Sequence, residues 1–307
     1  MILFLLFILG LAIGSFLNVL IDRIPNDESP FKGRSCCDKC KKTLKWYDMV
    51  PVLSFLILKG KCRYCKAHIS FYYPLVELIT GVMFVIVFFF LIESRIMNHE
   101  SLFTNFEFGN YLGFRISDFG FILNYFYYAF ILSSFIVIFF TDLKYGIIPD
   151  KVLFSAIIIS FFFLFFTSKE FLQLRSGQAW LSIPLQSTTL GVDQLATLGV
   201  VANRFLSALT SFAFFLILYL ITKGKGMGFG DVKLAFLLGL VLGFPKIIVA
   251  LYLAFLTGAL AGSILIVWRK KKLKSSIPFG PFLILGSILS IFFGEKILQL
   301  VLRLLNF

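Results

Sequence analysis

The chain has 307 residues, of which 59% are hydrophobic, including 41 phenylalanines. Soluble domains have an apolar share of about 45–50%, so this composition excludes a soluble globular protein and indicates an all-α polytopic membrane protein. The formal net charge of +13 also occurs in nucleic-acid-binding proteins. We exclude nucleic acid as a partner, because the basic residues gather in particular loops between apolar runs.

Eight apolar runs are predicted transmembrane helices, since about 17–25 apolar residues span a bilayer. The first, residues 1–21, has neither a basic n-region nor a small-residue cleavage site, so we interpret it as a retained helix and not as a signal peptide. Residues 233–244 form the shortest run. The other six are 73–92, 121–140, 152–167, 205–222, 247–268 and 279–305.

The distribution of Lys and Arg predicts the topology. Most of the 29 basic residues lie in or beside four alternate loops, at residues 22–72, 142–151, 223–233 and 269–274. The positive-inside rule therefore places these loops in the cytosol and both termini outside. The predicted outer loops, 93–120 and 168–204, hold few basic residues. The role of the long outer segment 168–204 does not follow from its residues.

All five cysteines lie in the first cytosolic loop. Cys37 and Cys40 form one C-x2-C pair, Cys62 and Cys65 form a second, and two such pairs are typical of a closed, structural zinc site. Disulfides are rare in the reducing cytosol, which favours a metal over cross-links. Cys36 is a surplus thiol that competes with Cys37 as a ligand. His68 is near enough in the sequence to compete as a ligand, but the pattern favours an ordinary loop histidine.

Asp142 and Asp231 each stand where a membrane-length apolar run meets a cytosolic loop. An ionisable residue at membrane depth is costly, so a functional role is the default hypothesis. Two such carboxylates brought together can share one proton, so that one activates a water and the other polarises a carbonyl. This is the chemistry of an aspartic protease, and it predicts that Asp142 and Asp231 are catalytic. Asp150 is instead predicted to cap the next helix.

Several motifs together resemble the type IV prepilin peptidases, the leader-peptidase/N-methyltransferase enzymes of pilus and type II secretion systems. Each motif alone is weak, but their order and spacing cover nearly the whole chain. The chain departs from the family where Cys37 and Asp38 follow Cys36 and where Met49 replaces an Asn. The motifs are Ala12 to Pro25, the two Cys pairs, Trp46 to Asp48, Tyr73 to Glu77, Asp142 to Asp150, and Gly228 to Lys233.

The resemblance implies an activity, a substrate and a site. It implies cleavage of the basic leader peptide of type IV prepilins or pseudopilins at the cytosolic face of the bacterial inner membrane. The new N-terminal residue is then methylated with S-adenosylmethionine. The family's two catalytic aspartates map onto Asp142 and Asp231, and the peptidase site needs no metal.

The resemblance also divides the chain. Residues 1–93 hold helix 1, the zinc loop at about 22–72 and helix 2, and form the expected methyltransferase part. Residues 121–307 form the expected six-helix peptidase domain. Glu77, Gly81, Asn18 and Arg23 are assigned to methyl transfer, with a structural Glu77–Arg23 ion pair as the alternative.

Two other functions stay open at this point. One is a monofunctional peptidase whose zinc loop is only structural. The other is a membrane transporter with a metal-binding loop, whose intramembrane carboxylates carry ions. The second is disfavoured because the apolar runs show no paired broken segments.

Overall fold

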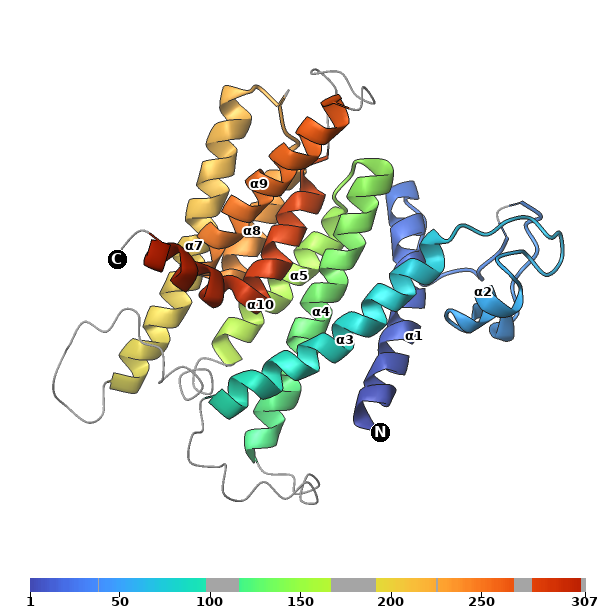
Figure 1. The fold of residues 1–307 in the computed structure, drawn as a ribbon, viewed down its shortest axis with the longest axis horizontal. Helices are drawn as coiled ribbons and strands as arrows, with labels where there is room; N and C mark the ends of the chain where they lie inside the picture. Colours follow the sequence, from blue (N-terminus) through green and yellow to red (C-terminus); the bar gives the residue numbers. More distant parts are fainter. Residues whose placement is uncertain (38, 98–115, 167–191, 225, 268–277, 305–307) are drawn as a thin grey trace. The chain divides into compact units, whose positions relative to one another are not determined.

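The structure is a computed structural model that describes residues 1–37, 39–97, 116–166, 192–224, 226–267 and 278–304. Within these ranges the regular elements are helices, and β-pairing is confined to two isolated bridges (Figure 1). The predicted all-α membrane fold is therefore confirmed. Most of the two predicted outer loops, and the basic stretch after residue 267, lie outside the described residues.

The chain forms two compact units. The first consists of Met1–Phe89 and Tyr128–Val152, and the second of Phe90–Tyr127 and Leu153–Phe307. Helix α4 (Ile116–Tyr145) contributes to both units. The boundary between the two packed units therefore differs from the predicted boundary between the two functional parts. That functional division into residues 1–93 and 121–307 stays a prediction.

The first unit holds α1 (Ile2–Arg23), the short helix α2 (Leu53–Ile57), most of α3 (Tyr72–Met97) and the second half of α4. Glycines let α1 and α3 approach closely. A Cβ on Gly14 would lie 2.7 Å from Glu77 Cα, and one on Gly10 would lie 2.7 Å from Gly81 Cα. Because such distances exclude any side chain, this helix pair depends on its glycines.

The second unit contains α5 (Asp150–Phe166) from Leu153 onwards. It also contains α7 (Val192–Ile221), α8 (Phe229–Leu242), α9 (Lys246–Val267) and α10 (Gly280–Leu304). Helix α8 is apolar on all sides and almost wholly buried, as expected of a central helix. Gly239 packs against α7, where a Cβ would lie 2.5 Å from Ala208 Cα. The Asn203 side chain holds the turn after α8 by two hydrogen bonds of 3.1 Å: its Nδ2 donates to Phe244 O, and its Oδ1 accepts from the Phe244 N–H.

The predicted count of eight spans is not confirmed. Six described helices are long and apolar enough to cross a membrane, and they lie within α1, α3, α4, α7, α9 and α10. The other two predicted runs correspond to α5, with 17 residues, and α8, with 14 residues. At about 1.5 Å per residue, α8 is well short of the roughly 30 Å hydrocarbon core.

Candidate active site and metal centre

Asp142 lies in the last turn of α4. Gly146, at a φ of +67°, ends this helix, and its N–H donates to the Asp142 carbonyl oxygen at 2.9 Å. Only 5% of Asp142 is exposed, and the neighbouring Thr141 is fully buried. Pro149 precedes α5, which begins at Asp150. The structure therefore holds Asp142 at a helix end, inside the protein.

A hydrogen-bonded network ties this end of α4 to the other helices of the first unit. The Asp22 carboxylate, at the end of α1, accepts hydrogen bonds from Lys144 Nζ at 2.6 Å, the Tyr73 hydroxyl at 2.9 Å and the Tyr145 hydroxyl at 3.5 Å. Lys144 is thus engaged with Asp22. The sequence could have indicated this role, because Asp22 is an acidic residue between an apolar run and a strongly basic loop.

Asp231 lies in the first turn of α8. Gly228 is the N-cap, and the Asp231 N–H donates to its carbonyl oxygen at 3.2 Å. Asp231 is 6% exposed. Backbone N–H groups and the helix macrodipole stabilise an anion at this end of a helix. The Lys233 ammonium lies over the rings of Phe229 and Phe154, at 5.4 and 5.6 Å from their centroids.

The two aspartates belong to different compact units, Asp142 to the first and Asp231 to the second. Each is buried at a helix end beside a loop that the sequence places in the cytosol. Their combination into one site stays a prediction.

The two C-x2-C pairs form matching hairpins. In the first, the Cys37 N–H donates to Lys42 O at 3.0 Å and the Lys41 N–H to Cys37 O at 2.8 Å. Cys62, Ala67 and Lys66 repeat this pattern at 2.8 and 2.9 Å. Lys41 and Lys66 both adopt a positive φ, of 56° and 55°. Each hairpin thereby turns its two thiols to the same side.

The four thiols gather in one cluster. The Sγ atoms of Cys37, Cys40, Cys62 and Cys65 lie within 4.8 Å of one another, and Cys37 and Cys65 are 3.8 Å apart. Sulfurs bound tetrahedrally to zinc, at Zn–S distances of about 2.3 Å, lie about 3.8 Å apart. The donor set and its spacing therefore fit zinc. Neither Cys36 nor His68 belongs to the cluster, so the geometry favours Cys37 over Cys36.

The thiols differ in their readiness to ionise. Backbone N–H groups of Cys65 and Tyr64 lower the pKa of the Cys62 thiol to about 7. The Ala67 N–H also acts to lower the pKa of Cys65, but burial and the neighbouring thiols outweigh it and raise that pKa to about 11. A bound divalent cation would supply the positive charge that lets all four ligands ionise.

An ion pair that the sequence did not predict orders the same loop. Asp48, almost fully buried, accepts a hydrogen bond from Arg63 Nε at 2.7 Å and one from the Lys45 N–H at 3.3 Å. Its carboxylate raises the pKa of the Arg63 guanidinium. Because Arg63 lies between Cys62 and Cys65, this pair joins one cysteine hairpin to the preceding segment.

The residues assigned to methyl transfer have structural contacts. Glu77 Oε2 accepts the Val52 N–H at 2.8 Å, and Asn18 Nδ2 donates to Tyr73 O at 3.0 Å. Arg23 donates to three loop carbonyls, those of Ser29, Lys32 and Arg34. Gly81 is in close contact with α1. Arg23 thus binds loop backbone, and the alternative ion pair with Glu77 is not formed. The methyl-transfer assignment stays a prediction.

The described residues define a multi-pass membrane protein with two buried carboxylates at helix ends and a four-cysteine cluster between its first two long helices. The chain matches the model of the bacterial peptidase A24 N-terminal domain over residues 8–91. It matches that of the type IV leader peptidase family over residues 129–263.

Curated relatives extend this match along the chain. The prepilin leader peptidase/N-methyltransferase of Bacillus subtilis (strain 168) is 31% identical over 299 residues, covering 97% of each chain. The protein of that name from Aeromonas salmonicida (strain A449) is 28% identical over 322 residues, covering 95% of this chain and 91% of its own. No solved structure matches the chain. The chain belongs to the type IV leader peptidase family.

The cysteine cluster makes a prediction about metal content. Cys62→Ser should abolish zinc binding to the purified protein, because a three-thiolate set loses the closed coordination of a structural site. Cys36→Ser should leave about one zinc per chain, since Cys36 lies outside the cluster. Elemental analysis of both variants beside the unchanged protein measures this. Equal zinc loss in both variants would contradict the assignment.

Proposed function

We propose that this protein is a bifunctional leader peptidase and N-methyltransferase of the bacterial inner membrane. It cleaves the basic leader of type IV prepilins or pseudopilins and methylates the new N-terminus. The observation that carries the proposal is the end-to-end relationship to the Bacillus subtilis protein, at 31% identity over 97% of both chains. The buried Asp142 and Asp231 supply the groups that such a peptidase needs.

Asp142 and Asp231 act as a pair of carboxylates on one substrate. One carboxylate is ionised and takes a proton from the attacking water, while the other is protonated and donates to the scissile carbonyl oxygen.

The substrate reaches this pair from the cytosolic side of the membrane. The positive-inside pattern supports cytosolic loops after α4 and before α8, and so supports a position of both aspartates at the cytosolic boundary. A prepilin whose apolar helix lies in the bilayer and whose leader lies in the cytosol presents its cleavage site at the same depth. Cleavage therefore occurs at the interface, without a metal in the peptidase site.

The zinc cluster has a structural role. Four thiolates leave no open coordination position for a substrate or a water. Cys37, Cys40, Cys62 and Cys65 would hold the metal, which would tie together a loop that has few buried apolar residues of its own.

The methyltransferase activity uses S-adenosylmethionine and belongs to the N-terminal part, which matches the A24 N-terminal domain. Glu77, Gly81, Asn18 and Arg23 lie in or beside this part and remain the residues assigned to methyl transfer. Their structural contacts mean that their loss would also disturb helix packing and the loop.

Replacing either aspartate tests the peptidase assignment. Asp142→Asn and Asp231→Asn should each lower the cleavage rate of a membrane-embedded prepilin by at least about 100-fold, the range expected when acid–base catalysis is lost. Asp150→Asn should retain activity, because Asp150 begins α5 and has no catalytic role. Gel-based cleavage assays with purified proteins measure this. Normal processing by either of the first two variants would defeat the assignment.

Mass analysis of the product tests the second activity. With S-adenosylmethionine present, the unchanged protein should yield a shortened pilin that carries one additional methyl group on its N-terminus. A shortened product without the methyl group would leave a monofunctional peptidase. An uncut substrate with every variant, including the unchanged protein, would remove both activities.

A further inference from the structure

The short helix α2 presents an apolar face that the protein does not cover. Leu53, Leu56 and Ile57 follow the i, i+3, i+4 spacing that places residues on one side of a helix. They are 57%, 63% and 74% exposed. Phe55 instead packs inwards: its ring lies edge-on to Phe71, with centroids 6.0 Å apart, and covers Gly60. Helix α2 therefore carries apolar residues on its exposed outer face as well as on its inner face.

A buried carboxylate fixes the position of α2 along α3. The N–H of Val52, the residue just before α2, donates to Glu77 Oε2 at 2.8 Å. Tyr72 begins both α3 and its membrane-length stretch, and Glu77 follows on the next turn. At about 1.5 Å per residue, Glu77 lies roughly 7 Å into this span. Helices that lie on membrane surfaces insert about 5–10 Å, so the Glu77–Val52 hydrogen bond would hold the start of α2 at the depth of the interface.

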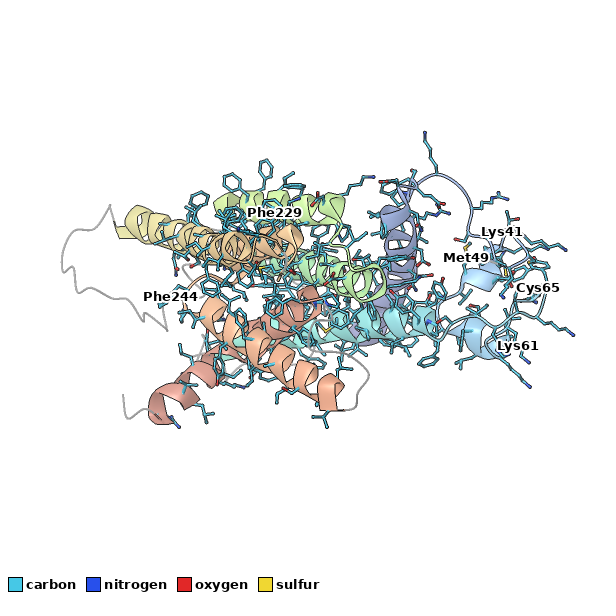
Figure 2. The ribbon with its side chains drawn as sticks, turned by 90° about the horizontal axis from the view of Figure 1, so that it is seen from above. Lys41, Met49, Lys61, Cys65, Phe229 and Phe244 are labelled. Carbon is cyan, nitrogen blue, oxygen red and sulfur yellow. The ribbon has the colours of Figure 1, made fainter. Side chains whose placement is uncertain are left out.

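The loop around α2 is strongly basic. Between residues 39 and 68 the one acidic residue is Asp48, which is paired with Arg63. Figure 2 shows Lys41 and Lys61 with Cys65 in the loop, beyond the long helices of the first unit. Trp46, a residue type enriched at membrane interfaces, is 77% exposed. The basic residues are Lys39, Lys41, Lys42, Lys45, Lys59, Lys61, Arg63 and Lys66.

We propose that α2 is an interfacial helix that docks the cysteine loop onto anionic lipids of the cytoplasmic leaflet. Leu53, Leu56 and Ile57 enter the boundary between headgroups and acyl chains, which removes their apolar surface from water. Lys59 and Lys61, directly after α2, bind the anionic headgroups. Glu77 sets the depth through the Val52 N–H. This proposal does not depend on either proposed enzymatic activity.

Spin-label accessibility at Leu56 tests the proposal. The full chain carrying Cys36→Ser and Leu56→Cys is labelled and reconstituted into nanodiscs with phosphatidylglycerol and phosphatidylcholine. The label should be more accessible to oxygen, which concentrates in acyl chains, than to a water-soluble nickel chelate. The matched control, Thr43→Cys, lies in the same loop at an exposed polar position and should show the opposite order. Zinc content confirms that the loop is folded in each sample.

Two results would overturn the proposal. Nickel accessibility at Leu56 equal to that at Thr43 would place α2 in water. Protection of Leu56 from both reagents would show that protein covers this face, such as a second copy of the chain or a bound pilin.

The contribution of anionic lipids to the docking of α2 has its own test. Pure phosphatidylcholine nanodiscs should make the Leu56 label less accessible to oxygen and more accessible to nickel. Lys59→Gln/Lys61→Gln should remove this difference between the two lipid compositions. An unchanged difference in that double variant would show that these two lysines are not the lipid contacts. Glu77→Ala, which removes the acceptor for the Val52 N–H, should raise nickel accessibility at Leu56 in both compositions.

Discussion

The cost of a carboxylate at the edge of a bilayer is the constraint on which this protein is built. A buried charge needs hydrogen bonds or an opposite charge nearby. Glu77 meets this need with the Val52 N–H, and the partly exposed Asp22 is bound by Lys144 and two tyrosine hydroxyls. Asp142 and Asp231 lie at the ends of apolar helices. In the proposed function these positions would keep ionisable groups close to the membrane boundary, where a leader peptide meets its apolar helix.

The division of the chain by packing would give the N-terminal part a share in the proposed peptidase. The family model for the leader peptidase begins at residue 129, yet Asp142 packs within the same compact unit as α1 and the cysteine loop. The Asp22–Lys144 ion pair joins the end of α1 to the turn that carries Asp142. The N-terminal part would therefore position a catalytic residue in addition to its proposed role in methyl transfer.

Patterns that are local in sequence were predictable. The C-x2-C spacing identified the cysteine cluster, and the hairpin register, with Cys36 bridged to Thr43, then distinguished Cys37 from Cys36. Features that depend on distant contacts were not predictable, because Asp22 and Lys144 are 122 positions apart. Hydropathy also left the number of spans open, since it measures apolar content and not helix length. Helix α8 is apolar because protein surrounds it, and its 14 residues are too few to span the hydrocarbon core.

The most direct measurement is a cross-linking experiment that tests whether Asp142 and Asp231 lie close together in the membrane. Cysteines replace both residues in a Cys36→Ser background, a short bifunctional thiol reagent is added, and linked peptides are identified by mass spectrometry. The account predicts a link in Asp142→Cys/Asp231→Cys and none in Glu93→Cys/Asp231→Cys, because the predicted topology has Glu93 at the opposite side of the membrane. No link in the first pair, although each thiol reacts with a monofunctional reagent, would contradict a shared catalytic site.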